Sequence, residues 1–309
     1  MAEKLRHILT SQQFDKVFLE QELFPLAKEM EVAAVKKNRN SLKNKIVCLL
    51  FYEPSTRTRI SFETAVTLLG GTALSTENAA EFSSAIKGET LEDTIRIIQG
   101  YHHNAIVLRH KEEGAAKRAA RVSNIPVINA GDGKGQHPTQ ALLDIYTIFS
   151  KFGEVDGKRV VMVGDLAHGR TINSLTYLLA KFKGVSVDFV SPPGFEVQVG
   201  IKDYLKKHHM PFSENKTLKE AVKKADVVYM TRAQKERFVE GEGYSAYQKE
   251  YRMDPEMLNI LPKSSIVMHP LPRTDELPPE VDVDPGVVIF KQAQNGLYIR
   301  MALLEMLLT

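Results

Sequence analysis

Residues 55–59, STRTR, place three hydroxyl side chains and two arginines a few positions after the apolar run IVCLLF. The helical spacing of the following SFETAVTLLGG, which ends in glycine, predicts that residues 55–58 lie at a helix amino terminus. Free backbone N–H groups and the helix dipole favour a phosphate there, and hydroxyls and an arginine fork can add donors. These residues therefore predict a phosphate site, with a solvated surface turn as the alternative. Arg59 is expected to point away from Arg57 and to form a salt bridge within the fold.

Arginine also follows several other apolar runs that could form strands. Arg109 follows AIVL, Arg170 lies in LAHGRT after VVMVGD, Arg232 follows VVYMT, and Arg273 lies in HPLPR after SSIVM. A single arginine at a strand end is usually a surface residue, but several at one edge repel one another. Two unit charges about 4 Å apart interact by roughly 4 kcal/mol at an effective dielectric constant near 20. The cluster therefore predicts an anionic ligand with more than one negative charge.

Short apolar runs alternate with amphipathic stretches of helix length, which predicts β-α units around parallel sheets. A chain of 309 residues is long enough for about two domains. The predicted strands fall into two groups of four, at residues 45–52, 71–76, 105–110 and 125–130, and at residues 158–165, 185–191, 225–231 and 264–270. Long helices over residues 137–153 and 289–309 would join two α/β domains, with a cleft between them. Such sheets bind ligands outside the carboxyl ends of their strands, where the arginines lie.

Composition argues against several classes of protein. The formal net charge of +3 is too small for a protein that coats a polyanion such as nucleic acid. No apolar run approaches the ~20 residues that span a bilayer, and the first residues lack secretory and transit patterns, so we expect a cytosolic location without a membrane. The single cysteine, Cys48, lies inside an apolar run and is expected to be a buried core residue.

Two segments resemble nucleotide-binding loops but lack a required residue. GDLAHGRT follows a predicted strand, but Arg170 stands where a phosphate-binding loop needs lysine. GDGKGQ has Gln136 where a dinucleotide fingerprint needs its third glycine, and is expected to be a turn. Neither a nucleoside triphosphate nor NAD is therefore predicted. No histidines or carboxylates have the spacing of a zinc or magnesium site, so no metal is required.

Three histidines follow predicted strands or precede helices. His137 in HPTQ lies at the first turn of a predicted helix, where it could simply cap backbone groups. His168 is expected to be a loop residue. His269, between a predicted strand and Pro270, is expected to orient the backbone.

Five segments, STRTR, HPTQ, GDLAHGRT, TRAQKER and HPLPR, resemble the aspartate/ornithine carbamoyltransferase family in this order, over essentially the whole chain. HPLPR resembles the aspartate branch in particular, because the ornithine branch is expected to carry HCLP where this chain has Pro270. The resemblance implies a carbamoyl-phosphate-binding domain made of residues 1–137 and 291–309, and an aspartate-binding domain made of residues 138–290.

The resemblance also implies a reaction and a site. The α-amino group of L-aspartate attacks the carbonyl carbon of carbamoyl phosphate, giving N-carbamoyl-L-aspartate and phosphate without a cofactor. The implied catalytic residues are Arg57, Thr58, Lys87, Arg109 and His137. The implied carbamoyl phosphate ligands are Ser55, Thr56, Arg57, Thr58, Ser83, Lys87, Arg109, His137, Gln140, Pro270 and Leu271. The implied aspartate ligands are Lys87, Arg170, Arg232, Gln234 and Leu271.

Family members also share sites between subunits. The residues matching Ser83 and Lys87 reach into the active site of a neighbouring subunit, which implies a homotrimer. A carboxylate near the phosphate loop holds the closed state by pairing with arginines of the other domain. Glu53 with Arg170 and Arg237 match those positions. The sequence leaves open whether a separate regulatory chain binds.

Departures from the family pattern are few. Ala167-His168 stands where many members have Lys-Tyr before GRT, and Ile86 replaces a second basic residue before Lys87. The first change could alter aspartate affinity, and the second removes one charge from the phosphate site. One alternative is a different amine acceptor such as ornithine, and another is a non-catalytic phosphate-binding subunit on the same scaffold.

Overall fold

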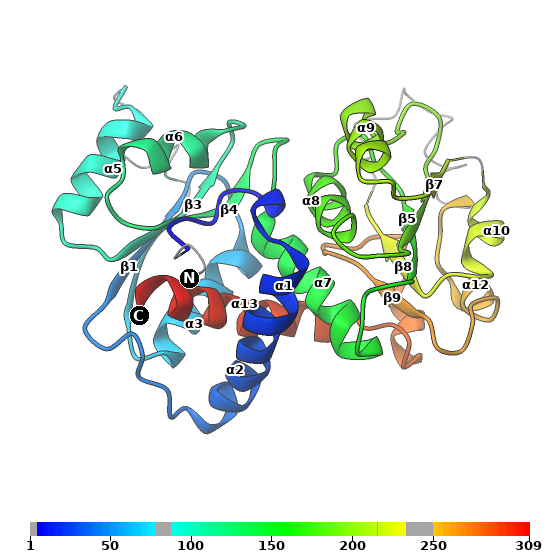
Figure 1. Cartoon of the computed structure of the whole chain (residues 1–309), viewed down its shortest axis with the longest axis horizontal. Coiled ribbons are helices and arrows are strands. Elements are labelled where there is room, and N and C mark those ends of the chain that lie inside the picture. The colour runs from blue at the N-terminus through cyan, green and yellow to red at the C-terminus, as the bar shows by residue number, and fades with distance from the viewer. Residues whose placement is uncertain (1–4, 78, 80–87, 215, 233–249) are drawn as a thin grey trace. The chain divides into compact units, whose positions relative to one another are not determined.

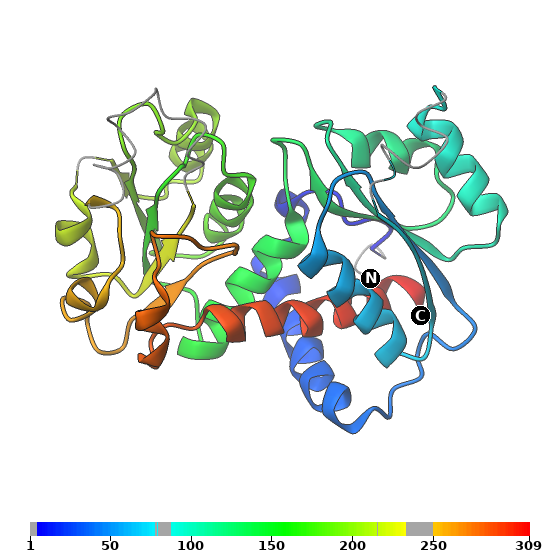
Figure 2. The same cartoon turned by 180° about the vertical axis from the view of Figure 1, so that it is seen from behind.

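The strands of the computed structural model pair in parallel and form two separate sheets, with helices on both faces of each (Figures 1 and 2). The structure describes residues 5–77, 79, 88–214, 216–232 and 250–309. The chain divides into two compact units, the first of Met1–Tyr146 with Gln294–Thr309, and the second of Thr147–Ala293. Within the described residues, no helix is long and apolar enough to cross a membrane.

The first unit contains a four-stranded sheet in the order β2-β1-β3-β4. Its strands are β1 (Ile46–Phe51), β2 (Thr72–Thr76), β3 (Ala105–His110) and β4 (Val127–Asp132). Its helices are α1 (Lys16–Phe18), η2 (Leu19–Leu23), α2 (Phe24–Lys36), α3 (Thr56–Leu68), α5 (Leu91–Gly100) and α6 (Ala115–Val122), with the 3-10 turn η1 (Ser11–Gln13).

Side chains alternate across this sheet, as strand geometry requires. Cys48, Leu50 and Ile106 point to the face covered by α5 and α6, where they join one apolar cluster. The opposite face is covered by α3 (Figures 1 and 2). Cys48 is the buried core residue expected from its apolar neighbours, and burial raises the pKa of its thiol to about 11. A thiol with so high a pKa is a poor nucleophile at neutral pH.

The second unit contains a five-stranded sheet in the order β7-β6-β5-β8-β9. Its strands are β5 (Arg159–Val163), β6 (Ser186–Val190), β7 (Phe212–Ser213), β8 (Val227–Met230) and β9 (Ile266–Met268). Its helices are α8 (Arg170–Leu179), α9 (Val199–Lys207), α10 (Leu218–Val222) and α12 (Pro255–Leu258), with the 3-10 turn η5 (Pro279–Val283). Figure 1 shows α8 and α9 on one side of this sheet and α10 and α12 on the other.

Two long helices, α7 (Pro138–Phe152) and α13 (Ile289–Leu308), belong partly to each unit. Both were predicted from the sequence, and α7 ends where expected, at Gly153 in the left-handed conformation. Gly296 in α13 packs against α7, since an added Cβ would lie 2.9 Å from a methyl carbon of Leu143. All eight predicted strands are confirmed. Strand β7 was not predicted, because two residues are too few to form a pattern.

In each sheet, the order in which successive strands are added reverses next to the first strand. From β1 the chain goes to β2 on one side and then to β3 on the other, and from β5 it goes to β6 and then to β8. Ligands of open α/β sheets bind outside the carboxyl ends of the strands at such switch points. The loops after β1, β3, β5 and β8 are therefore the places to look for a site.

Candidate active site

The phosphate loop predicted at residues 55–58 lies at a helix amino terminus, as expected. Ser55 is the N-cap residue of α3, although its hydroxyl forms no capping hydrogen bond, and the N–H of Arg59 donates to the Ser55 carbonyl at 3.1 Å, closing the first turn. The N–H groups that precede Arg59 have no acceptor within the helix, because each would need a carbonyl four residues earlier in the helix. The Thr58 side chain is 7% exposed. Helix α3 thus offers several backbone donors to an anion, with a hydroxyl residue in its first turn.

The two arginines of this loop have different surroundings. Arg59 forms ion pairs with Glu63 at 2.8 Å and with Glu77 at 3.1 Å, so the predicted scaffold role is confirmed. No carboxylate among the described residues forms an ion pair with Arg57. Arg57 is exposed overall, yet partial burial of its guanidinium lowers its pKa. Arg57 is therefore the arginine of this pair that can take an external anion.

Arg109 lies at the end of β3, beside the phosphate loop in the sheet order. Its Nη1 donates to the Ala130 carbonyl at 3.3 Å, and its Nε lies 3.6 Å from Oε2 of Glu53. Its carbonyl accepts the N–H of Tyr52 at 2.9 Å, which ties the chain leaving β1 to β3. These contacts hold a half-buried guanidinium at the first switch point.

A tight turn connects β4 to His137. The Asp132 carboxylate accepts the N–H groups of Gly114 and Gln136, both at 3.0 Å, and the Asn129 amide at 3.1 Å. This confirms the turn predicted from GDGKGQ. His137 directly precedes α7 and is 5% exposed, with its Nδ1 3.4 Å from the Thr139 hydroxyl. The imidazole is thus held at the end of β4, next to β3 in the sheet.

A buried network that the sequence interpretation missed orients Gln140. The Gln140 Nε2 donates to Oδ1 of Asp144 at 2.9 Å, which leaves its Oε1 as the end that can accept a hydrogen bond. Asp144 is fully buried, and Arg300 of α13 is 3% exposed. Burial lowers the pKa of Arg300 to about 10, although the charge of Asp144 raises it. The Arg300 guanidinium also lies 5.2 Å from the ring centre of Phe62 in α3.

The second sheet brings a second set of arginines to its switch point. Gly164 directly follows β5 at φ +115°, and an added Cβ would lie 2.3 Å from the Thr231 carbonyl oxygen. The Thr231 N–H and hydroxyl both donate to the Val163 carbonyl at 2.8 Å. Arg170, the first residue of α8, follows β5, and Arg232 follows β8 and is exposed. Both arginines therefore follow the carboxyl ends of neighbouring strands.

Two further loops complete this edge. His168 lies in the β5–α8 loop, with Nδ1 3.0 Å from Oδ1 of the buried Asp165. After β9, Leu271 adopts φ +59°, and its N–H donates to Nδ1 of His269 at 2.8 Å. The expectation that His269 orients the backbone is therefore confirmed.

Four of the predicted site residues lie outside the described residues: Ser83, Lys87, Gln234 and Arg237. The proposed closure contact of Glu53 with Arg170 and Arg237 accordingly stays a prediction. Among the described residues, no group of three or more His, Cys, Asp or Glu side chains could hold a metal ion.

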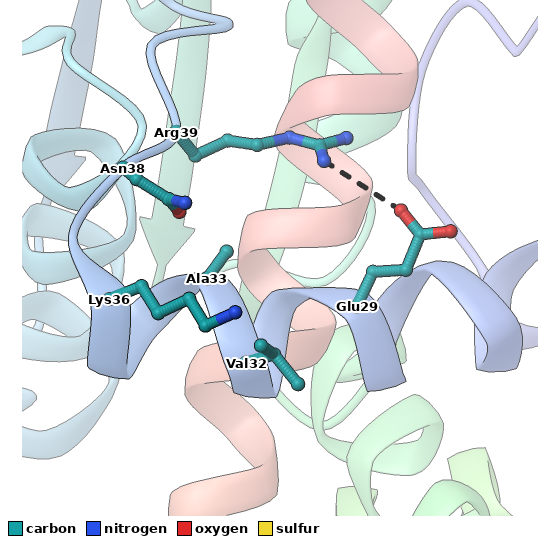
Figure 3. Close-up of a pocket in the computed structure, with 6 residues that line it drawn as sticks. All are labelled: Glu29, Val32, Ala33, Lys36, Asn38 and Arg39. Carbon is teal, nitrogen blue, oxygen red and sulfur yellow. Dashed lines mark ion pairs between the residues drawn. The ribbon is translucent and has the colours of Figure 1, made fainter.

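A hollow on the first unit lies elsewhere, beside the carboxyl end of α2. It is lined by Glu29, Val32, Ala33, Lys36, Asn38 and Arg39 (Figure 3). Arg39 pairs there with Glu29 at 3.7 Å and also with Glu305 of α13. From this hollow the chain runs to the amino end of β1, whereas the predicted ligands follow the carboxyl ends of the strands. The hollow is therefore not part of the strand-end site.

Family models match both parts of the chain. Residues 6–150 match the carbamoyl-P binding domain of aspartate/ornithine carbamoyltransferase, and residues 156–307 match its Asp/Orn binding domain. The chain belongs to the aspartate/ornithine carbamoyltransferase family. The predicted resemblance and the predicted fold class are both confirmed.

Several similar proteins are named as aspartate carbamoyltransferases or transcarbamoylases. Aspartate carbamoyltransferase of Arabidopsis thaliana, named as chloroplastic, is 53% identical over 99% of this chain and 78% of its own length. The catalytic subunit of M. jannaschii aspartate transcarbamoylase is 42% identical, with a TM-score of 0.91 over 98% of both chains. Aspartate transcarbamoylase of Trypanosoma cruzi, in complex with carbamoyl phosphate and aspartate, is 35% identical. Its TM-score is 0.91 over 98% of this chain and 96% of that chain.

The expected cytosolic location is wrong by the same comparison. The Arabidopsis relative is named as chloroplastic, and so are relatives from rice and pea at 52% identity. The expectation rested on the lack of a transit pattern in the first residues of the chain. Those residues carry no such conclusion.

Proposed function

We propose that this chain transfers the carbamoyl group of carbamoyl phosphate to the α-amino group of L-aspartate. The observation that carries the proposal is the first switch point, where α3 begins after β1 with Arg57 in its first turn, and Arg109 lies at the end of the neighbouring strand β3. Family membership and relatives solved with carbamoyl phosphate and aspartate support the choice of substrates. The reaction would be the first committed step of pyrimidine synthesis.

In the proposed site, the first domain holds carbamoyl phosphate. Residues 55–58 bind the phosphate through backbone N–H groups, hydroxyls and the Arg57 fork. Arg109 bridges a phosphate oxygen and the carbonyl oxygen, and His137 and Thr58 donate to that carbonyl oxygen. Donors fixed in advance are favourable because they need no reorganisation when negative charge develops on the oxygen. The Gln140 Oε1 accepts from the carbamoyl NH₂.

The second domain holds L-aspartate. Arg170, Arg232 and Gln234 bind its two carboxylates, for which a planar guanidinium is better suited than a lysine ammonium. The backbone carbonyls of Pro270 and Leu271 accept from the carbamoyl NH₂, and that of Leu271 also from the aspartate amine. Two arginines suit a dianionic acceptor, whereas a cationic acceptor such as ornithine would be repelled.

The covalent change is small. The neutral amine of aspartate forms the new N–C bond at the carbonyl carbon, and the C–O bond to phosphate then breaks. The proton that the nitrogen loses goes to the departing phosphate, so no protein group has to gain or lose a proton during turnover. Positioning and electrostatic stabilisation therefore supply most of the rate, and each oxyanion donor contributes about 3 kcal/mol.

An acceptor panel tests the proposal. Purified protein is incubated with carbamoyl phosphate and one of several amines, including aspartate and ornithine, and carbamoylated products are measured. We expect carbamoyl-aspartate alone. Carbamoyl-ornithine as the main product would show that ornithine, and not aspartate, is the acceptor. Ligand binding without any transfer would indicate a non-catalytic subunit.

The proposed assembly is a homotrimer whose sites are shared between subunits, with Ser83 and Lys87 supplied by the neighbour. Mixing two inactive variants, Lys87→Gln and Arg57→Ala, tests this. If sites are shared, some hybrid trimers contain one site with neither substitution, and activity returns after mixing. Continued inactivity of the mixture would argue against sharing, provided that each variant is folded.

A further inference from the structure

We propose that His269 and Glu276 form a buried positioning pair that sets the direction of the Pro270 and Leu271 carbonyls. Neither His269 nor Glu276 is among the proposed substrate ligands. The inference rests on the proposed function, because these two carbonyls matter only if they receive the carbamoyl NH₂ and the aspartate amine.

Hydrogen bonds to both ring nitrogens fix the His269 imidazole. Nδ1 accepts the N–H of Leu271 at 2.8 Å, and Nε2 lies 3.0 Å from Oε1 of Glu276. Because Nδ1 is an acceptor here, the ring proton sits on Nε2 and points at the carboxylate. The imidazole is therefore held in one tautomer and one orientation, with its acceptor nitrogen beneath the Leu271 N–H.

The Glu276 carboxylate is built into the same loop. It accepts the Thr274 N–H at 2.8 Å on Oε1 and the Thr274 hydroxyl at 2.6 Å on Oε2. Both Glu276 and His269 have side chains about 2% exposed or less. Burial raises the pKa of Glu276, but the hydrogen bonds from His269 and Thr274 outweigh it and lower the pKa to about 2. The carboxylate is thus a charged acceptor that holds the imidazole throughout the neutral pH range.

Leu271 shows why such support is needed. Its φ of +59° is in the left-handed region, which costs a residue with a Cβ roughly 1–2 kcal/mol. The hydrogen bond from its N–H to His269 fixes the peptide that carries the Pro270 carbonyl, because that N–H and that carbonyl belong to the same planar unit. The torsion angles of Leu271 then set the direction of its own carbonyl.

The loop is also anchored at its start. The backbone N–H of His269 donates to Oε1 of Gln292 at 2.9 Å, and Gln292 is buried in α13. His269 is therefore held at its backbone by a long helix and at its imidazole by the Glu276 carboxylate. Only the second contact passes through the imidazole, so changes at His269 and Glu276 can move the carbonyls while the strand and helix stay in place.

A substitution with a matched control tests the pair. Glu276→Gln keeps the size of the side chain but removes its charge. The control is Ser265→Ala, at the other end of β9, which removes the 2.6 Å hydrogen bond from the Ser265 hydroxyl to the Ala225 carbonyl. We expect both variants to lower the melting temperature. Only Glu276→Gln should lower kcat/KM for aspartate, by about tenfold, which corresponds to about 1.4 kcal/mol. Equal kcat/KM values for Glu276→Gln, Ser265→Ala and the unmodified chain would overturn the inference.

A second pair of variants tests the Leu271 contact alone. Asparagine at position 269 can accept the N–H two residues later, as asparagines do in turns, although it is too short to reach Glu276. His269→Asn should therefore keep a kcat/KM for aspartate several-fold above that of His269→Ala. Equal losses in both variants would show that the hydrogen bond to Leu271 does not position the carbonyls.

Amide hydrogen exchange at residue 271 checks the network without any turnover. Faster exchange in Glu276→Gln than in Ser265→Ala would support the pair, and equal exchange would overturn it. The proposed function fails separately, if the unmodified chain forms no carbamoyl-aspartate.

Discussion

The two sheets use the same topology to present arginines but differ in what surrounds those arginines. At the first switch point, Arg57 lies in the first turn of α3, which offers backbone N–H groups and the hydroxyl of the buried residue Thr58. At the second, Arg170 also opens a helix, α8, but the N-cap residue there is Gly169, which has no hydroxyl, and Arg232 is exposed after β8. Several convergent donors suit a tetrahedral phosphate, whereas planar forks on separate segments suit two carboxylates. In the proposed site, topology thus supplies the edge, and the residue types at that edge select the anion.

The largest expected effect is at His137, which lies at the first sheet edge. At the second edge, neither His168 nor His269 is a proposed substrate ligand. His137→Ala should lower kcat by about 10²–10³-fold, because it removes one donor to the carbonyl oxygen where charge develops. The affinity for carbamoyl phosphate should fall less than tenfold, since the phosphate ligands remain. Steady-state kinetics and equilibrium binding separate the two effects, and equal losses in both would contradict an oxyanion role.

A smaller effect is expected from the glycine that closes the second edge. Gly164→Ala places a Cβ 2.3 Å from the Thr231 carbonyl oxygen at φ +115°, so the β5–β8 contact must open. We expect a loss of about 3 kcal/mol in the free energy of unfolding. Gly194→Ala is the control, because Gly194 also has a positive φ but no atom within 4 Å of an added Cβ. Denaturant unfolding of both variants gives the difference, and similar losses would mean that backbone strain alone accounts for the effect.

Arginine-to-lysine exchanges test whether the two edges bind anions differently. Arg170→Lys should raise the KM for aspartate about 10- to 100-fold, because an ammonium cannot form the paired hydrogen bonds of a fork. Arg57→Lys should weaken carbamoyl phosphate binding by less than tenfold, since lysine binds phosphate well as a point charge. Kinetics with each substrate varied in turn would measure both. Equal losses of substrate binding for lysine at the two positions would contradict the idea that the two edges bind anions differently.

The sequence predicted what local patterns encode. Eight strands, a helix amino terminus at residues 55–58 and the scaffold role of Arg59 all follow from apolar runs, helical periodicity and spacing within a few residues. The family of the chain could also be predicted, because each of the five segments that carry the resemblance is a short stretch of sequence. The cytosolic location was wrong because it rested on two absences, that of an apolar run long enough to span a bilayer and that of a secretory or transit pattern in the first residues.

Contacts between distant segments were not predictable in the same way. Asp144 lies four residues after Gln140, so a helical pattern could have suggested their hydrogen bond. Arg300 inside the apolar run YIRMALL signalled a buried charge, but not its neighbour. The bond between His269 and Glu276 depends on how one irregular loop folds back on itself, for which no periodic pattern exists.

The smallest expected effect separates the two arginines of the phosphate loop. Arg59→Gln removes ion pairs with Glu63 and Glu77, which are partly exposed, so stability should fall by only about 0.5–1 kcal/mol. The kinetic constants should stay within twofold, whereas Arg57→Gln, two positions earlier, should weaken carbamoyl phosphate binding at least tenfold. Thermal unfolding and substrate titrations of both variants make the comparison. Because the two residues share a helix turn and a side-chain type, an equal loss of binding in both would mean that charge near α3, rather than a particular guanidinium, holds the phosphate.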